Sequence, residues 1–243
     1  MRHTFIMLVV GTISLSATAE TLSDLRNTLE RFPAKAPFAV RATVSTNTAA
    51  DDNANRAGTS SFDIDSGPSG FSVRIPPSVL NAAQREAAQK KRDPNVATPT
   101  RTSMVAVTIF DIINALDAAS LLLDDLHGAT VLEEKSAAWE GKPAKLLRVK
   151  VKPSLATKSR YVTEPVIELT IWSGGDGVPL AARRVSTFEA GALFVKAGNI
   201  RTEQWTFAVA GDRLYATRNE AEDDASAVGK KMTRSCTVTY KVR

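Results

Sequence analysis

The chain contains 243 residues, of which 43% are hydrophobic and 23% are charged, and its formal net charge is +5. This composition is typical of a folded globular protein and argues against an intrinsically disordered chain. The length is sufficient for one sizeable domain or two small ones. Such a mild excess of basic residues does not indicate nucleic acid, and no nucleic-acid partner is expected.

The first 19 residues have the anatomy of a secretory signal peptide. A basic start, MRH, precedes the apolar run TFIMLVVGTISLSA and the small residues ATA at 17–19. We expect cleavage before Glu20. An uncleaved anchor is the alternative, but the run is short and rich in Ser and Thr, and no later stretch has about 20 apolar residues. The mature protein is therefore expected in the periplasm of a Gram-negative-type cell, without a transmembrane segment.

The first residues of the mature chain have apolar side chains at the spacing of a helix. Leu22, Leu25, Leu29 and Phe32 recur at helical intervals before Pro33, which cannot continue a helix. We therefore expect an amphipathic helix of about three turns, with one face to bury.

Strand-like and helical patterns then alternate. Residues 36–46 are rich in β-branched side chains and predict a strand, and the small polar residues 47–60 predict a loop. Apolar residues alternate over 61–76 on both sides of the turn SGPSG, which predicts a hairpin. Residues 77–93 predict a helix with Ser78 as its cap, followed by a Pro- and Thr-rich connector. Helix and connector, at about 77–103, are expected to form an excursion from the body.

The stretch VTIFDIINALDAASLLLDDLHGA (107–129) is the most hydrophobic of the mature chain. Four aspartates interrupt it too often for a membrane span. We expect one or two helices that end at Gly128 and pack against a sheet. The predicted apolar helical face contains Ile109, Ile112, Ile113, Leu116, Ala119, Leu122, Leu123 and Leu126.

From residue 129 to the C-terminus the apolar residues recur with a period of two, which is typical of strands. Leu147, Val149 and Val151 alternate with basic residues, so that strand has one apolar and one solvated face. The acidic stretch NEAEDDAS (219–226) is expected to be a solvated loop. The predicted fold class is α+β: one long antiparallel sheet, curved because strands twist, with helices on its concave face.

The segment IELTIWSGGDGVPLAARR (167–184) predicts two strands joined by a glycine turn. A phosphate loop would need a helix after the glycines, but Pro179 and β-branched residues follow. One aspartate, Asp176, is not an array of calcium ligands. Asp176-Gly177 is instead a hairpin signal, because glycine adopts positive φ without strain.

The residues that carry catalytic chemistry are few. Cys236 lies in a strand-like run and is expected to be a small buried side chain, since no base lies near it in sequence. His127, the single histidine of the mature chain, is expected at a helix C-terminus. A zinc site of His and Cys ligands is nearly excluded, and no nucleophile elbow occurs. We therefore expect a protein that is not an enzyme and has no metal or other cofactor.

Pairs of adjacent carboxylates remain, and three of them are considered as sites. Glu133 and Glu134 lie in a predicted strand and would point to opposite faces. Asp124-Asp125 and Asp223-Asp224 are expected to be solvated. Distant carboxylates can still converge in a glycosidase, and the sequence does not exclude this.

The order of elements is similar to that of the LolA/LolB-like superfamily of periplasmic lipoprotein and lipid carriers. The similar parts are TLSDLRNTLERFPAKAPFAVRATVST, GFSVRIPP, WEGKPAKLLRVKV and IELTIWSGGDGVPLAARRV. The resemblance implies a single domain over residues 20–243, an incomplete barrel whose apolar concave face is closed by helices and holds acyl chains. It implies no catalytic residues. It places Arg74 where the lipoprotein carriers have a basic residue that holds the lid.

These observations favour a non-catalytic carrier for an amphiphile, either a lipid or an acylated protein. The apolar helices at 107–127 would plug the concave face; if the plug is loose, acyl chains can replace it. The alternative is an envelope scaffold that binds a protein partner through charged outer faces, such as Arg148, Lys150 and Lys152 or Arg183 and Arg184. The expected apolar lining consists of Phe71, Val73, Ile109, Ile113, Leu116, Leu122, Leu147, Val149, Leu169, Trp172, Trp205 and Phe207.

Overall fold

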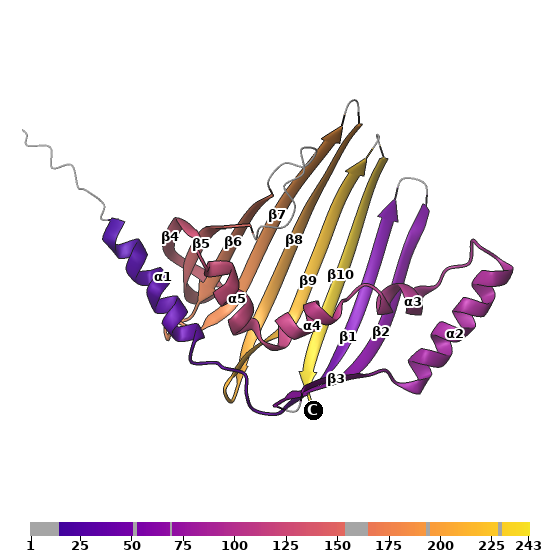
Figure 1. Ribbon diagram of the computed structural model, residues 1–243, viewed down its shortest axis with the longest axis horizontal. Helices are drawn as coiled ribbons and strands as arrows, with labels where there is room; N and C mark the ends of the chain where they lie inside the picture. The colour runs from indigo at the N-terminus through magenta and orange to yellow at the C-terminus, as the bar shows by residue number, and fades with distance from the viewer. Residues whose placement is uncertain (1–14, 51–52, 69, 154–164, 193–194, 228–229) are drawn as a thin grey trace, which may run out of the picture.

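Ten antiparallel strands form one open, curved sheet, and five helices lie along one side of it (Figure 1). The computed structural model describes residues 15–50, 53–68, 70–153, 165–192, 195–227 and 230–243. Most of the predicted signal peptide lies outside these residues. Helix α1 begins at Leu15 and runs through the predicted cleavage site before Glu20.

The elements have the following bounds. The helices are α1 (Leu15–Leu29), α2 (Pro77–Arg92), α3 (Pro99–Met104), α4 (Ile109–Leu116) and α5 (Ala118–Leu126). The strands are β1 (Phe38–Ala50), β2 (Asn53–Gly67), β3 (Gly70–Arg74), β4 (Thr130–Trp139), β5 (Lys142–Val151), β6 (Val166–Ser173), β7 (Pro179–Ala192), β8 (Val195–Ala210), β9 (Arg213–Ala227) and β10 (Lys230–Val242).

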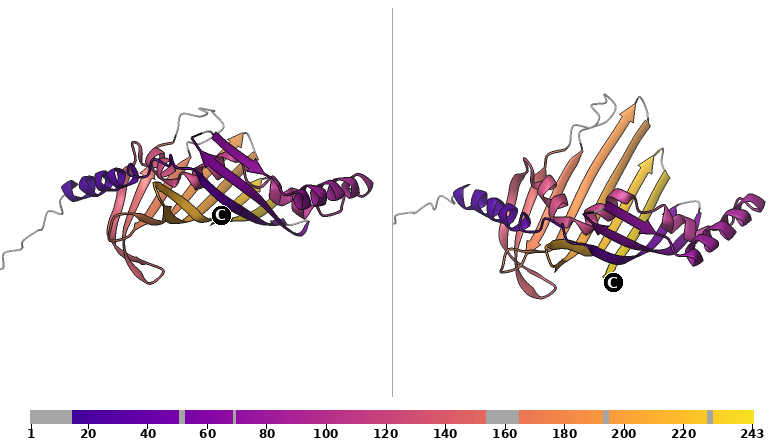
Figure 2. Two further views of the ribbon diagram at one scale, coloured as in Figure 1. Left: turned by 90° about the horizontal axis from the view of Figure 1, so that it is seen from below. Right: turned by 60° about the horizontal axis from the view of Figure 1, so that its bottom comes forward.

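The strand order is β3-β2-β1-β10-β9-β8-β7-β6-β5-β4. Every neighbour in the sheet is also a neighbour in the chain, except that β1 pairs with β10. The chain must therefore travel from β3 at one edge to β4 at the other, and it does so through α2–α5. This crossing lays α3, α4 and α5 over the concave face, while α2 projects beyond the β3 edge, as the two further views show (Figure 2). The predicted α+β architecture is confirmed.

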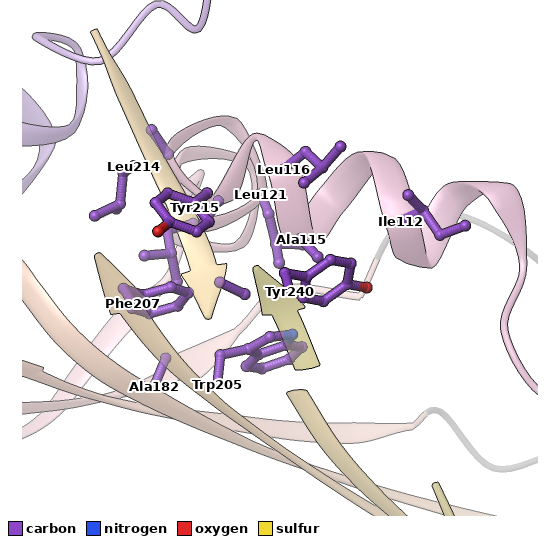
Figure 3. Packing of buried hydrophobic residues seen from close by; sticks show 14 of the residues in the cluster. Ile112, Ala115, Leu116, Leu121, Ala182, Trp205, Phe207, Leu214, Tyr215 and Tyr240 are labelled. Carbon is purple, nitrogen blue, oxygen red and sulfur yellow. The ribbon is translucent and has the colours of Figure 1, made fainter. Parts of the chain in front are cut away.

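The core lies between the concave face and the helices α1, α4 and α5. Val40 of β1, Val149 of β5 and Leu169 of β6 are fully buried, as are Leu122 and Leu126 of α5. Figure 3 shows the aromatic side chains of the sheet lying below the helical residues Ala115, Leu116 and Leu121. The strands and the helices each have a single apolar face, as their sequence patterns predict, and these two faces pack against each other to form the core.

Two segments that the sequence predicts to be loops are strands. Most of 47–60 belongs to the paired strands β1 and β2, and 219–226 belongs to β9. The first segment consists of small, mostly polar residues and shows no apolar period, and pairing with long neighbouring strands imposes the extended conformation. In the second segment the charges are paired across strands: Asp223 contacts Arg201 at 3.0 Å.

The excursion at 77–103 is more ordered than its sequence suggests. The predicted connector contains α3, which packs on β1 and β2. Glu86 of α2 accepts hydrogen bonds from the backbone N–H groups of Thr100 (2.9 Å) and Arg101 (3.0 Å), which are unpaired donors at the start of α3. Ser78 is not the cap of α2, because Pro77 occupies the first turn after Pro76.

The hairpin that the Asp176-Gly177 turn predicts is confirmed, and a second glycine turn joins β4 and β5. The β4–β5 turn places Glu140 and Gly141 at φ +49° and +77°. In the β6–β7 turn Gly177 has φ +79°, and Asp176 Oδ1 accepts a hydrogen bond from the Val178 N–H at 3.0 Å. A strand follows this turn, so it has none of the helix N-terminus that a phosphate loop requires.

Candidate functional site

Helices α4 and α5 cover the middle of the concave face. The break between them is at Asp117, whose side chain caps α5 by accepting from the Ser120 N–H at 3.2 Å. Thr108 and Asp111 form a capping box at the start of α4. The sequence therefore encodes two short helices with strong N-termini in place of one long helix.

Each helix end is tied to the rest of the molecule by an arginine. The buried Arg213 of β9 donates to the Leu116 carbonyl at the end of α4 (3.0 Å). Arg26 of α1 donates to the Leu126 carbonyl at the end of α5. These carbonyls have no partner within their helices, so each arginine completes a helix C-terminus while fixing its position. The start of α4 has no such arginine among the described contacts: it has its own capping box, and Ala106 and Val107 before it pack against the margin of the core.

A row of five charged side chains crosses the concave face beside α5, and we call it the charged belt: Asp125, Arg184, Glu203, Arg201 and Asp223. Arg184 of β7 contacts Asp125 of α5 at 2.7 Å and Glu203 of β8 at 3.9 Å. Arg201 contacts Glu203 at 2.9 Å and Asp223 of β9 at 3.0 Å. Signs alternate along the belt, so each charge is compensated by a neighbour.

The pKa values of Asp125 and Arg201, two residues of the charged belt, differ from their ordinary values. Burial raises the pKa of Asp125 to about 6, although Arg184 opposes the rise. Although burial disfavours the Arg201 cation, its hydrogen bonds and charge contacts with Glu203 and Asp223 keep its pKa above the ordinary value. Asp125 Oδ2 and Arg184 Nε are buried without a hydrogen-bond partner in the described part of the chain.

The structure brings seven of the predicted lining residues together. They are buried in one cluster beneath or within the helical layer: Leu116, Leu122, Leu147, Val149, Leu169, Trp205 and Phe207. Leu116 and Leu122 are the helical side of this contact, and the other five form the floor. The helices therefore fill the space above the floor in this structure.

Five other predicted lining residues lie elsewhere. Ile109 and Ile113 are on the outer side of α4, with 52% and 41% of their surface exposed. Phe71 packs against the margin of the core from edge strand β3, where Val73 is exposed. Trp172 lies on the opposite face from Leu169, because an odd number of strand positions separates them. Its ring centroid is 5.0 Å from that of Trp139.

The structure shows the surroundings of two basic residues that the sequence analysis named, Arg74 and Arg184. Arg74 is exposed on β3 and contacts Asp65 of β2 at 3.5 Å. Arg184, named with Arg183 as part of a charged outer face, instead points to the concave side and holds α5 through Asp125. Adjacent strand residues face opposite sides, so only one of Arg183 and Arg184 can lie on the outer face.

Asp125 is the site residue that the sequence analysis misplaced, since it is buried and not solvated. The signal that identifies it is its spacing: it follows Leu121 and Leu122 by four and three residues, which places it on the same helical face. Arg213 gave no such signal, because a single arginine next to a turn is typical of an exposed position.

The groups considered for catalysis are separated. Cys236 of β10 is half-buried, and burial raises the pKa of its thiol, which keeps it protonated. His127 is exposed at the C-cap of α5. Glu133 and Glu134 pair with Arg148 and Leu147 on opposite faces of β5. Among the described residues no cluster of three or more His, Cys, Asp or Glu is arranged to hold a metal ion.

Two surface pockets lie away from the helical layer. One, of about 500 Å³, is at the end of the sheet between β1, β2, β3 and β10, and Phe38, Phe71 and Arg243 line it. The other, of about 420 Å³, is at the far ends of β7–β10, next to Phe188 and Met232. Neither is lined by α4 or α5, so neither gives access to the predicted floor.

Comparison with protein-family models and with curated protein sequences gave no match. Comparison with solved structures gave two similar chains. One is a LolA superfamily protein from Nitrosomonas europaea, with 14% identity, coverage of 95% of this chain and 92% of that chain, and a TM-score of 0.30. The other is a DUF1329 family protein from Desulfovibrio piger, with 12% identity, coverage of 91% and 92%, and a TM-score of 0.32.

The first of these matches carries the name of the superfamily that the sequence resembles. At TM-scores of 0.30 and 0.32, neither match supports a conclusion about this chain. Among the described residues, no helix combines the length and the apolar character that crossing a membrane requires.

Proposed function

We propose that the protein is a non-catalytic carrier of an amphiphile in the periplasm, and that the acyl part of the ligand binds on the concave face of the sheet. The expected ligand is a lipid or an acylated protein. The predicted signal peptide, with cleavage before Glu20, supports the location.

One observation carries this proposal: the apolar floor of a ten-stranded open sheet is covered only by short helices and not by a second sheet. Val149, Leu169 and Trp205 on three different strands are buried by this cover. A floor of this extent would bury acyl chains at about 25 cal/mol per Å² if the cover moved. The cost of moving it is the loss of the contacts that α4 makes.

Helix α4 is the part of the cover that is easiest to displace. Its C-terminal end is held by Arg213, while its other end leads into the segment after α3. Only one of its sides is buried, through Ile112, Ala115 and Leu116. Helix α5, in contrast, is held at Asp125 and at the Leu126 carbonyl. We therefore propose that an acyl chain reaches the apolar floor by displacing α4, beginning at its start.

Quenching of tryptophan fluorescence tests the proposal, because the three tryptophans lie on different faces. Trp205 is buried under the helical layer, while Trp139 and Trp172 pair on the opposite face. The variant Trp139→Phe/Trp172→Phe keeps Trp205 as the single tryptophan of the chain. We expect a brominated fatty acid to quench its emission with a saturable, stoichiometric dependence.

The matched control is Trp205→Phe, which keeps the two outer tryptophans. Its emission should change little at the same fatty-acid concentrations. Absence of saturable quenching of Trp205, in a protein whose circular dichroism shows it to be folded, would contradict the proposal. Equal quenching of both variants would show binding to the outer surface and would contradict it as well.

A further inference from the structure

Four large apolar side chains are exposed around the start of α4. Val105, Ile109, Phe110 and Ile113 have 75%, 52%, 71% and 41% of their surface exposed, and we call them the apolar ridge. Ile109, Phe110 and Ile113 share the outer side of α4, since they are spaced by one, three and four residues. Single exposed apolar residues are common on proteins, but a group of this size within nine residues marks an interaction site.

The segment before the ridge is cationic. Arg85, Lys91, Arg92 and Arg101 are exposed on α2 and α3, and none takes part in the ion pairs found within the described ranges. Two acidic residues, Glu86 and the exposed Asp93 at the C-cap of α2, offset part of this charge, but the basic residues outnumber them, so the segment keeps a net positive charge. Figure 1 shows α4, α3 and α2 following one another from the middle of the sheet to beyond its β3 edge, so the ridge and the cations lie on consecutive neighbouring elements.

We infer that this side docks on an anionic lipid surface, with the apolar ridge entering the membrane interface and the cations of α2 and α3 facing the headgroups. An apolar helical side flanked by Lys and Arg is the pattern of peripheral membrane attachment. Docking in this way requires no cavity in the concave face.

A lipid surface fits the side better than a protein does. The ridge projects from a helix, and a fluid interface accepts projecting side chains without a matching groove. The charged residues of α2, its C-cap and α3 carry a net positive charge, which complements anionic headgroups. In a second copy of this chain the same cations would face each other and repel, because a two-fold interface brings identical surfaces together.

Cosedimentation of the full chain with vesicles tests the inference. We expect the protein to bind vesicles of phosphatidylcholine mixed with phosphatidylglycerol, and to bind pure phosphatidylcholine much more weakly. Val105→Ser/Phe110→Ser should lower the partition coefficient by about tenfold or more, because two large apolar groups leave the interface. Lys91→Gln/Arg92→Gln should lower it by a similar factor, since each cation contributes about fivefold near an anionic surface.

Matched controls exist for both variants. Val209→Ser/Met232→Ser changes two other exposed apolar residues, and Lys145→Gln/Lys150→Gln changes two exposed cations of β5. The controls should bind as the parent does. The inference is overturned if the parent does not sediment with either vesicle, or if the ridge variant binds like its control. A parent dimer that the ridge variant dissociates would show a second copy as the occupant and would overturn it too.

The result is separable from the carrier function. The ridge substitutions can be combined with Trp139→Phe/Trp172→Phe and assayed with brominated fatty acid in the absence of vesicles. If Trp205 is quenched saturably but the parent does not bind vesicles, the carrier function is supported and the membrane docking is contradicted. If the parent binds vesicles but Trp205 is not quenched, the membrane docking is supported and the carrier function is contradicted.

Discussion

At the scale of single residues, Asp125 shows which of two opposed effects prevails. Its carboxylate contacts the Arg184 guanidinium at 2.7 Å, which favours the charged form. Burial disfavours that form, and the nearby Glu203 adds to the effect. Burial prevails, so the pKa rises to about 6. The contribution of Asp125 to the free energy of unfolding therefore depends on pH.

The sign of this pH dependence follows from the raised pKa. Between the ordinary value of 3.8 and about 6, the folded state binds more protons at Asp125 than the unfolded state does. The contribution of Asp125 to the free energy of unfolding is therefore greatest below pH 3.8 and falls by about 3 kcal/mol as the pH rises through 6. Urea denaturation at several pH values should show this fall in the parent and its loss in Asp125→Asn.

Asp124→Asn is the matched control for the pH experiment, because Asp124 is the exposed neighbour. Subtracting its profile removes the contributions of other carboxyl groups. If Asp125→Asn and Asp124→Asn have parallel profiles from pH 4 to 7, the proposed burial of the Asp125 charge is wrong.

At the scale of elements, the placement of α3 on β2 depends on a missing side chain. A Cβ added at Gly58 would lie 2.1 Å from the backbone oxygen of Pro99, at the start of α3. Backbone cannot move aside as the end of a long side chain can. The excursion is therefore attached to the sheet at a point that tolerates glycine alone.

We expect Gly58→Ala to lower the free energy of unfolding by about 1–3 kcal/mol, because α3 must lift from the strand. Hydrogen exchange at Thr100 and Arg101 should quicken with it. Gly175→Ala is the control, since a Cβ added there would have no other atom within 4 Å. Equal stability of the two variants would mean that α3 is not packed on β2 in solution.

At the scale of the whole molecule, the first and last strands meet inside the sheet. Val44 of β1 lies opposite Val238 of β10, and both are buried. The two sets of strands, β1–β3 and β4–β10, are joined by this pairing and by the helices that cross the concave face. Neither set can keep its apolar face covered without the other.

The mature chain, residues 20–243, is therefore expected to unfold as one unit. Calorimetry should show a single transition with equal calorimetric and van't Hoff enthalpies. Val238→Ala should move that transition to lower temperature without splitting it, because the cavity weakens the junction that both sets share. Two transitions, of which only one responds to Val238→Ala, would contradict a single domain.

Local patterns by themselves determined most of the elements. Alternation at Leu147, Val149 and Val151 placed β5 and its buried face, and the helical spacing of 107–126 placed α4 and α5. Glycine turns placed two hairpins. These features are readable because each depends on residues within a few positions, where the periods of strand and helix act directly.

Only the tertiary structure decided which strands pair and which side chains are buried. Pairing with long neighbouring strands gave strand conformation to most of 47–60, in β1 and β2, and to 219–226, in β9, whose polar residues have no period of their own. The tertiary structure also turned Arg184 toward Asp125, buried Asp125, and left Ile109 and Ile113 of the apolar segment exposed. Contacts between residues far apart in the chain select among faces that local pattern leaves equivalent, because burial is a property of the neighbours and not of the residue.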